Sequence, residues 1–227
     1  MREICLDTET TGLDPRNGDR VVEIACIEMV DKVRTGRFYH QYINPRRDMP
    51  QAAFAVHGLS SEFLETKPIF DHIAQDFLDF IQGGTLVIHN ASFDIKFLNA
   101  ELGMMGLPML DKASVIDTLS LARRKFPGSP ASLDALCKRF GIDLSRRSKH
   151  GALLDTELLC DVFVELMGGA QEGMAFANKD ADANDEQGLI LQDRKTIEKR
   201  DFIVSDADLE AHKKFITDNF KTNSWYS

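Results

Sequence analysis

Three short β-rich segments in the first 43 residues constrain the fold of this chain more than any other feature. They run from Glu3 to Leu6, from Val21 to Val30 and from Phe38 to Ile43. The links between them are short and contain turn-forming stretches, Gly12-Leu13-Asp14-Pro15 and Asp31-Lys32. Strands that follow one another across short links pair antiparallel. The sequence therefore predicts three antiparallel strands at the N-terminus.

The next part of the chain alternates between helix and strand. Apolar residues at four-residue spacing and a Gly83-Gly84 stop predict a helix from about Ile69 to Ile81. A buried strand at Thr85 to Ile88 and a helix from about Ser92 to Met105 follow. After Val115-Ile116 the chain is mostly helical, with helices expected near 117–125, 132–139 and 152–167. This order predicts an α/β fold with a mixed five-stranded sheet flanked by helices, which is the pattern of a ribonuclease-H-like fold.

The composition changes after Gly168-Gly169. Ala, Asn, Asp, Glu and Gln dominate as far as about Gly188, and a segment with so few apolar residues is typical of a flexible linker. Beyond it, Ser205 with Asp208 at the capping-box position predicts the start of a helix. We expect a domain at 1–169, a linker at 170–190 and a C-terminal tail at 191–227.

The formal net charge of −9 argues against a protein that binds nucleic acid unaided, because phosphate binding depends on Lys and Arg. A nucleic-acid role then requires carboxylates gathered around metal ions, or tethering to a DNA-binding partner. No apolar run approaches the ~20 residues of a membrane span. The four cysteines are widely separated and form no CxxC pair, so a reducing cytoplasm is the expected compartment.

Acidic residues and histidines lie beside the ends of predicted elements in three places. Asp7-Thr8-Glu9 ends the first strand, and residues two apart on a strand share a face. His89 to Asp94 spans the boundary between the buried strand and its helix, and His150 precedes the helix that Asp155 begins. Each motif alone has an ordinary alternative: a solvated pair, a favourable helix-dipole contact, or a surface histidine. Their order along the chain is the informative feature.

Asp-x-Glu, His-Asn-x-x-Phe-Asp and His-x4-Asp, in that order, resemble the three motifs of the DEDD exonuclease superfamily in its histidine-containing branch. The resemblance implies that Asp7, Glu9, Asp94 and Asp155 hold two divalent ions, Mg²⁺ or Mn²⁺. Hard oxygen ligands suit these ions, and a pair of them can clamp a scissile phosphate. It also implies that His150 takes a proton from the attacking water, since histidine titrates near neutral pH.

Four further stretches resemble the family of epsilon proofreading subunits of bacterial DNA polymerase III. They are Leu6 to Gly12, Val56-His57-Gly58, Leu133 to Cys137 and His150 to Asp155. The resemblance covers about residues 1–176 and, more weakly, the tail. It implies a 3′→5′ exonuclease that removes mismatched nucleotides from the single-stranded 3′ end of DNA. The substrate contacts that it implies are Asp7, Glu9 and Asp155, together with Thr8, Leu13, Val56, His57 and Phe93.

The same resemblance implies partners. The segment 171–176 is similar to the family's sliding-clamp-binding peptide, with Gln171, Met174 and Phe176 at its anchor positions. The tail is expected to dock on the polymerase (alpha) subunit through an apolar set: Phe202, Val204, Leu209, Phe215, Phe220, Trp225 and Tyr226. Tethering raises the local concentration of the exonuclease at the primer end, which reconciles its acidity with DNA cleavage. The sequence leaves open whether a small accessory (theta-like) subunit binds the catalytic domain.

Basic residues next to the motifs have two interpretations. Arg123-Arg124-Lys125, Lys138-Arg139 and Arg146-Arg147-Lys149 either line the path of the DNA strand or are solvated helix ends.

Three alternatives to the polymerase subunit remain at this point. An exoribonuclease such as ribonuclease T or an oligoribonuclease usually lacks a linker with a clamp-like peptide. A non-catalytic clamp–polymerase adaptor predicts a missing carboxylate or histidine, and a generic metal-binding storage or sensor domain predicts no nucleotide-holding segment.

Overall fold

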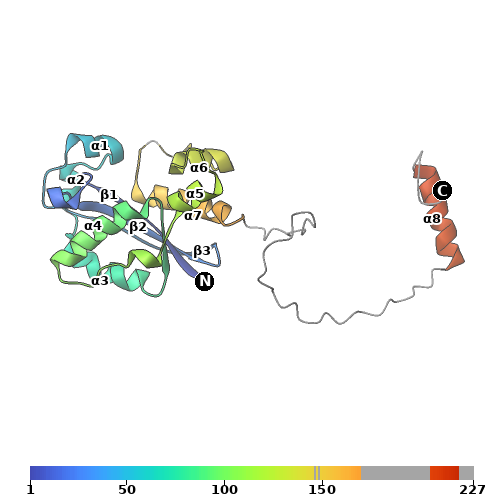
Figure 1. Cartoon of the computed structure of the whole chain (residues 1–227), viewed down its shortest axis with the longest axis horizontal. Helices are drawn as coiled ribbons and strands as arrows, with labels where there is room; N and C mark the ends of the chain where they lie inside the picture. Colours follow the sequence, from blue (N-terminus) through green and yellow to red (C-terminus); the bar gives the residue numbers. More distant parts are fainter. Residues whose placement is uncertain (146, 148, 170–204, 220–227) are drawn as a thin grey trace, which may run out of the picture. The chain divides into compact units, whose positions relative to one another are not determined.

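The computed structural model describes residues 1–145, 147, 149–169 and 205–219 (Figure 1). The chain divides into two compact units, residues 1–175 and 176–227. The first contains a five-stranded sheet with helices, and the described part of the second is helix α8 (Asp206–Asn219). No helix within these described ranges is long and apolar enough to cross a membrane.

The sheet has the strand order β3-β2-β1-β4-β5. Its strands are β1 (Arg2–Thr10), β2 (Val21–Val30), β3 (Val33–Tyr42), β4 (Thr85–Ile88) and β5 (Val115–Asp117). The first three pair antiparallel, whereas β4 pairs parallel with β1 and β5 parallel with β4. The predicted mixed five-stranded sheet is thus confirmed.

Strand β3 begins five residues earlier than the sequence predicts. Asp31 and Lys32 both adopt positive φ, 50° and 67°, and form a tight turn that pairs Val30 with Val33. The polar residues after Val33 are extended because this edge strand pairs through its backbone. Its side chains there are exposed, so no apolar alternation marks the segment.

Seven helices lie in the described part of the first unit, besides two short 3₁₀ turns, η1 (Pro15–Asn17) and η2 (Lys112–Ser114). Five agree with the predicted helices within one or two residues: α3 (Phe70–Ile81), α4 (Ala91–Met104), α5 (Thr118–Lys125), α6 (Leu133–Phe140) and α7 (Ala152–Leu166). The helices α1 (Gln51–His57) and α2 (Ser61–Glu65) are not predicted. Each is short and buries one residue, His57 and Leu64 respectively, so neither has an apolar periodicity to detect.

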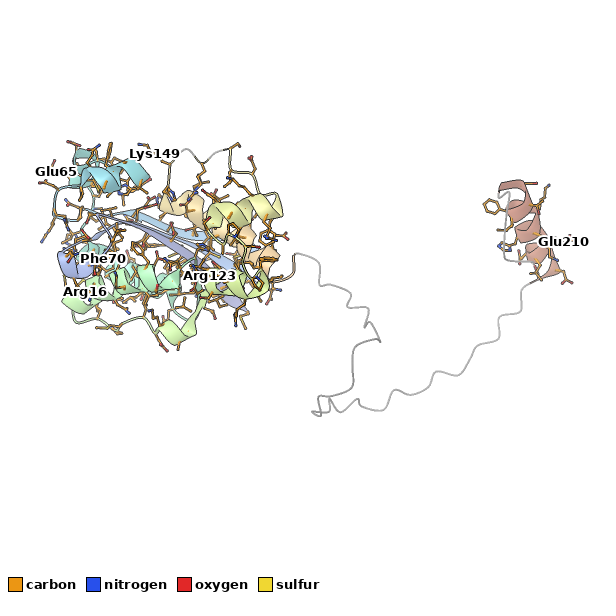
Figure 2. The ribbon with its side chains drawn as sticks, turned by 45° about the horizontal axis from the view of Figure 1, so that its top comes forward. Arg16, Glu65, Phe70, Arg123, Lys149 and Glu210 are labelled. Carbon is orange, nitrogen blue, oxygen red and sulfur yellow. The ribbon has the colours of Figure 1, made fainter. Side chains whose placement is uncertain are left out.

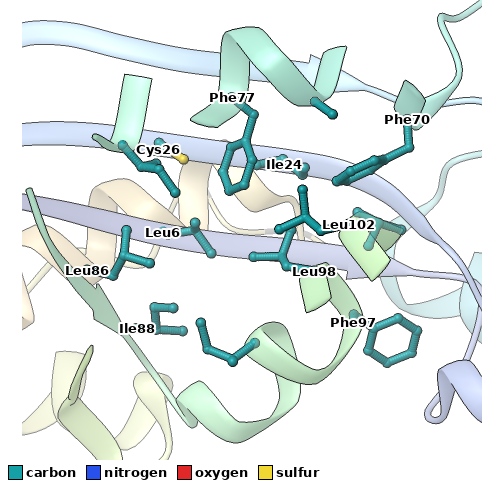
Figure 3. Packing of buried hydrophobic residues seen from close by; sticks show 14 of the residues in the cluster. Leu6, Ile24, Cys26, Phe70, Phe77, Leu86, Ile88, Phe97, Leu98 and Leu102 are labelled. Carbon is teal, nitrogen blue, oxygen red and sulfur yellow. The ribbon is translucent and has the colours of Figure 1, made fainter. Parts of the chain in front are cut away.

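The helices cover both faces of the sheet (Figure 1). Figure 3 shows one face, where Leu6 and Ile24 pack against Phe77 of α3 and Leu98 of α4. On the other face, Cys5 and its neighbours pack against α7. Because side chains alternate along a strand, consecutive residues of β1 face these two layers in turn. The C-terminal end of β1 therefore lies where both α4 and α7 can contribute side chains.

The four cysteines are free thiols buried in the described part of the chain, where each packs as a small hydrophobic residue.

Helix α8 begins where the capping box predicts. The Asp208 backbone N–H donates to Ser205 Oγ at 3.2 Å, and that hydroxyl donates to Asp208 Oδ2 at 2.6 Å. Leu209 and Phe215 are 41% and 58% exposed. The remaining tail residues, Phe202, Val204, Phe220, Trp225 and Tyr226, lie outside the described residues, as do Gln171, Met174 and Phe176.

Candidate active site

The end of strand β1 supplies two of the predicted carboxylates. Asp7 and Glu9 are two residues apart and share the face of the sheet that α7 covers. Glu9 is buried, with 9% of its surface exposed, and it lies opposite Glu23 of β2 in the antiparallel register. Carboxylates in this position need compensating partners, because burying an unpaired charge is costly.

Helix α4 supplies Asp94. Asn90 adopts the left-handed conformation (φ 64°, ψ 50°) and turns the chain from β4 into α4, so that Asp94 falls in the first helical turn. Asp94 is 3% exposed, and its Oδ1 accepts the Thr8 backbone N–H at 3.1 Å and the Thr8 hydroxyl at 2.7 Å. These bonds tie α4 to β1 and fix the orientation of the carboxylate.

The segment before α4 is braced rather than reactive. His89 Nδ1 lies 3.0 Å from Thr118 Oγ1, and the Asn90 backbone N–H donates to Asp117 Oδ1 at 3.1 Å. Burial lowers the pKa of His89, so its ring is neutral at physiological pH. These contacts brace the loop between β4 and α4.

Asp155 and His150 come from the start of α7 and the loop before it. Asp155 is buried in the first turn, whereas the His150 side chain is 51% exposed. Figure 2 labels Lys149, the neighbour of His150 in this segment. The His150 backbone N–H donates to the Val56 carbonyl at 3.2 Å, which ties the loop to α1, and His150 Nδ1 lies 3.1 Å from Asp155 Oδ2.

The predicted acidic residues converge. One ligand atom each of Glu9, His150 and Asp155 lies within 4.8 Å of the other two. Burial, followed by the charges of Asp94, Glu9 and Asp155, raises the pKa of Asp7 well above its usual range. Asp7 and Asp94 therefore lie within electrostatic reach of the same centre.

The pKa values of two other carboxyls show the same crowding. Burial, then the charges of Asp155 and Glu23, raises the pKa of Glu9 to about 8. Burial raises the pKa of Asp94 to about 7, and the hydrogen bonds from Thr8 oppose that rise. Acids in such a cluster favour protonation unless a positive charge lies among them.

Glu23 is a buried carboxylate beside the cluster that the sequence motifs do not include. It is 2% exposed; Oε1 lies 2.7 Å from His40 Nε2, and Oε2 accepts the Ala152 backbone N–H at 3.1 Å. Glu23 thereby anchors the first residue of the helix that carries Asp155. The available signal was a glutamate in the otherwise apolar run from Val21 to Val30, but Glu28 lies in the same run, so the sequence did not distinguish the two.

Arg147 lies inside the cluster, not on a solvated helix end. Its Nε donates to Asp155 Oδ1 at 2.6 Å and its Nη2 to Asp155 Oδ2 at 2.7 Å. Nη2 also lies 2.8 Å from His150 Nδ1, and Nη1 bonds Asp134. The Arg147 side chain is only 9% exposed.

The side chains expected to contact substrate differ in their surroundings. Leu13 and Val56 are 80% and 48% exposed, so neither is a core residue. Phe93 is partly buried and its ring centroid lies 5.0 Å from that of Phe97. The Thr8 hydroxyl is bonded to Asp94.

His57 is buried and forms a defined hydrogen bond within the chain. Its Nδ1 accepts the Leu59 backbone N–H at 3.1 Å, so Nε2 carries the proton of the neutral ring. Burial lowers the pKa of His57, partly offset by the nearby Thr10 backbone.

Comparisons with known proteins place the chain among nucleases. Residues 4–163 match the model of a family described as exonuclease, RNase T. The DNA polymerase III subunit epsilon of Rickettsia conorii is 52% identical over 227 residues, covering 98% of each chain. That of Escherichia coli K12 is 40% identical over 221 residues, covering 93% of this chain and 90% of the relative.

Two solved structures share the fold. Exonuclease X in complex with 5′ overhanging duplex DNA superposes with a TM-score of 0.56 at 28% identity, covering 72% of this chain and 90% of that one. The nuclease domain of 3′hExo, a DEDDh family member bound to rAMP, superposes with a TM-score of 0.63 at 17% identity, covering 73% and 91%.

Proposed function

This chain belongs to the exonuclease family and, within it, to the DNA polymerase III epsilon subunits, and we propose that Asp7, Glu9, Asp94 and Asp155 form its hydrolytic centre. The activity is that of a 3′→5′ proofreading exonuclease, with DNA as substrate and the polymerase holoenzyme as partner. The convergence of the predicted acids supports the proposed centre best. The charges of Asp94, Glu9 and Asp155 all raise the pKa of Asp7.

The donor set fits divalent cations. Carboxylate oxygens are the ligands that Mg²⁺ and Mn²⁺ prefer, and their charge would offset the repulsion that raises the pKa of Glu9. We assign two such ions to the four carboxylates. When bound, they would stabilise the charge that develops on the scissile phosphate.

His150 is proposed as the general base. It is half exposed on a loop at the edge of the carboxylate cluster, where an attacking water can reach it. An imidazole is the side chain best suited to proton transfer near neutral pH. Asp155 lies at hydrogen-bond distance from the ring and would orient it.

The terminal nucleotide is proposed to lie between exposed apolar side chains and the carboxylates. Leu13 and Val56 offer exposed apolar surface, and the neutral ring of His57, whose proton is on Nε2, is buried. Phe93, Thr8 and the acids Asp7, Glu9 and Asp155 complete the proposed set of contacts. Thr8 acts through Asp94, since its hydroxyl is committed to that carboxylate.

The C-terminal part is proposed to tether the nuclease in the cytoplasmic replication complex. We assign residues 1–169 to the catalytic domain, 170–190 to a linker with the clamp-binding peptide 171–176, and 191–227 to the tail that binds the alpha subunit. The exposure of Leu209 on α8 and full-length similarity to epsilon subunits support this assignment. A small theta-like subunit is a further proposed partner.

The test of the catalytic proposal is degradation of single-stranded DNA labelled at the 3′ or the 5′ end, with Mg²⁺ or with EDTA. We expect stepwise release of nucleoside monophosphates from the 3′ end, nearly abolished in Asp7→Ala and His150→Ala. Asp161→Ala is the matched control, because Asp161 is also on α7 but pairs with Arg34 at 2.6 Å. Full activity of Asp7→Ala would refute the proposed centre.

The adaptor alternative requires a lost catalytic residue, and all four carboxylates and His150 are present.

A further inference from the structure

We infer that Arg147 is a positioning residue that locks Asp155 and His150 together and must release Asp155 before a divalent cation binds there. This inference rests on the proposed cation site. The guanidinium bonds both oxygens of Asp155 and lies 2.8 Å from His150 Nδ1. One side chain thus engages a proposed metal ligand and the proposed base at the same time.

The lone pairs of Asp155 show why Arg147 competes with a cation. Each carboxylate oxygen has two lone-pair positions. Oδ2 accepts Arg147 Nη2 at 2.7 Å and Oδ1 accepts Arg147 Nε at 2.6 Å, so the guanidinium takes one lone-pair position on each oxygen. A divalent cation that binds Asp155 must use a lone pair beside this guanidinium. The two groups repel each other, because both are positive.

The contact with His150 engages the base as well. A guanidinium only donates hydrogen bonds, and a neutral imidazole has one nitrogen that accepts them. Nδ1 is therefore the acceptor for Arg147 Nη2, and Nε2 carries the proton. The lone pair that would take a proton from water is occupied while Arg147 holds the ring. Release of Arg147 from Asp155 also removes this restraint.

Asp134 gives the guanidinium a second partner. Arg147 Nη1 bonds Asp134, which lies in the first turn of α6 and has a half-exposed side chain. Leaving the buried guanidinium of Arg147 with no acidic partner would be costly. When Arg147 releases Asp155 it stays paired with Asp134, which avoids that cost. Arg147 therefore has two acidic partners of unequal burial, and a cation competes for only the buried one.

The test measures Mn²⁺ affinity of the full chain by calorimetric titration. Charge-assisted bidentate bonds are among the stronger hydrogen bonds. Removing this competitor with Arg147→Gln should therefore tighten Mn²⁺ binding by about tenfold or more. Arg147→Lys keeps the charge but loses the fork, and should tighten binding less. Asp134→Asn should weaken binding in the parent and have no effect in Arg147→Gln, as a double-mutant cycle reveals.

The matched control is Arg20→Gln. Arg20 also forms a bidentate pair with a buried carboxylate, Glu101, at 2.8 and 2.6 Å, away from the cluster. It should leave Mn²⁺ affinity unchanged. Thermal melting with and without Mn²⁺ shows whether Arg147→Gln folds. If Arg147→Gln does not fold, the Mn²⁺ affinity of Arg147→Lys tests the inference in its place.

The outcomes separate the two proposals. If the parent binds no Mn²⁺, or Asp155→Asn binds it as well as the parent, the proposed cation site is wrong. If Asp155→Asn loses binding while Arg147→Gln binds Mn²⁺ no more tightly than the parent, the site stands and the lock is refuted. Equal affinity of Arg147→Lys and the parent would likewise overturn the bidentate mechanism.

Discussion

Replacing Thr8 by valine should weaken catalysis through Asp94 without disturbing the fold. The Thr8 hydroxyl donates to Asp94 Oδ1 at 2.7 Å, and both side chains are buried, at 6% and 3% exposure. Valine has nearly the same shape, so the change removes one hydrogen bond and leaves the packing in place. Thr8→Ser keeps the hydroxyl and is the matched control.

The magnitude follows from the charge of the acceptor. A hydrogen bond to a charged group is worth about 1.5–3 kcal/mol, which corresponds to roughly 10- to 100-fold in an equilibrium constant. The Thr8 bond lowers the pKa of Asp94, whose value burial has already raised to about 7. Its loss should raise that pKa further, so that a larger fraction of Asp94 is protonated at neutral pH. A cation must then displace the proton, and the Mg²⁺ concentration for half-maximal activity should rise by that factor.

The assay is hydrolysis of a 3′-labelled oligonucleotide over a range of Mg²⁺ concentrations at pH 7 and pH 9. Thr8→Val should need about 10- to 100-fold more Mg²⁺ at pH 7 and recover part of the loss at pH 9, where a larger fraction of Asp94 is ionised. Thr8→Ser should follow the parent. If Thr8→Val matches Thr8→Ser at both pH values, the hydroxyl does not tune Asp94 and the reasoning is wrong.

Three further predictions concern stability and domain organisation. In EDTA, the free energy of unfolding should fall as pH rises from about 4.5 to about 8, because the raised pKa of Glu9 favours its protonated form in the native state. Saturating Mg²⁺ should flatten this pH dependence. Urea denaturation measures it, and equal slopes with and without Mg²⁺ would contradict the prediction. Glu23→Gln should destabilise the protein by about 1–3 kcal/mol, since it removes a charged acceptor from His40 and the Ala152 N–H; urea denaturation measures this loss, and an unchanged midpoint would count against it. Deleting residues 176–227 should spare hydrolysis of single-stranded DNA but abolish co-purification with the polymerase subunit, and loss of hydrolysis would show that the nuclease needs its tail.

The sequence predicts those parts of the site that follow from local periodicity. Asp7 and Glu9 share a face because they are two apart on a strand, and Asp94 and Asp155 lie in first helical turns because β4 and the His150 loop end just before them. Their convergence then follows from sheet order, since β1 lies between β2 and β4. The five predicted helices, α3 to α7, and the hairpin turn at Asp31 could also be predicted, because local sequence determines them.

Contacts between side chains that are distant in the sequence could not be predicted from it. Glu23 anchors α7 across 129 positions of sequence, and no local pattern encodes that bond. Arg147 is closer to its partners, but a basic residue near a helix start is usually solvated, so sequence gave no reason to bury it. The helices α1 and α2 escaped prediction because each buries a single residue.

Arg147 also explains how the fold accommodates so many buried acids. Glu23 adds a fifth carboxylate whose charge raises the pKa of both Asp7 and Glu9. Within the cluster, the charge of Arg147 lowers the pKa of Glu9, opposing part of that repulsion. The same positive charge that makes the cluster compatible with folding must oppose cation binding, because both act on the same carboxylates. The interaction that stabilises the fold of this centre therefore weakens its affinity for metal ions. Arg147→Gln should make the protein less stable in EDTA and should make it bind Mn²⁺ more tightly.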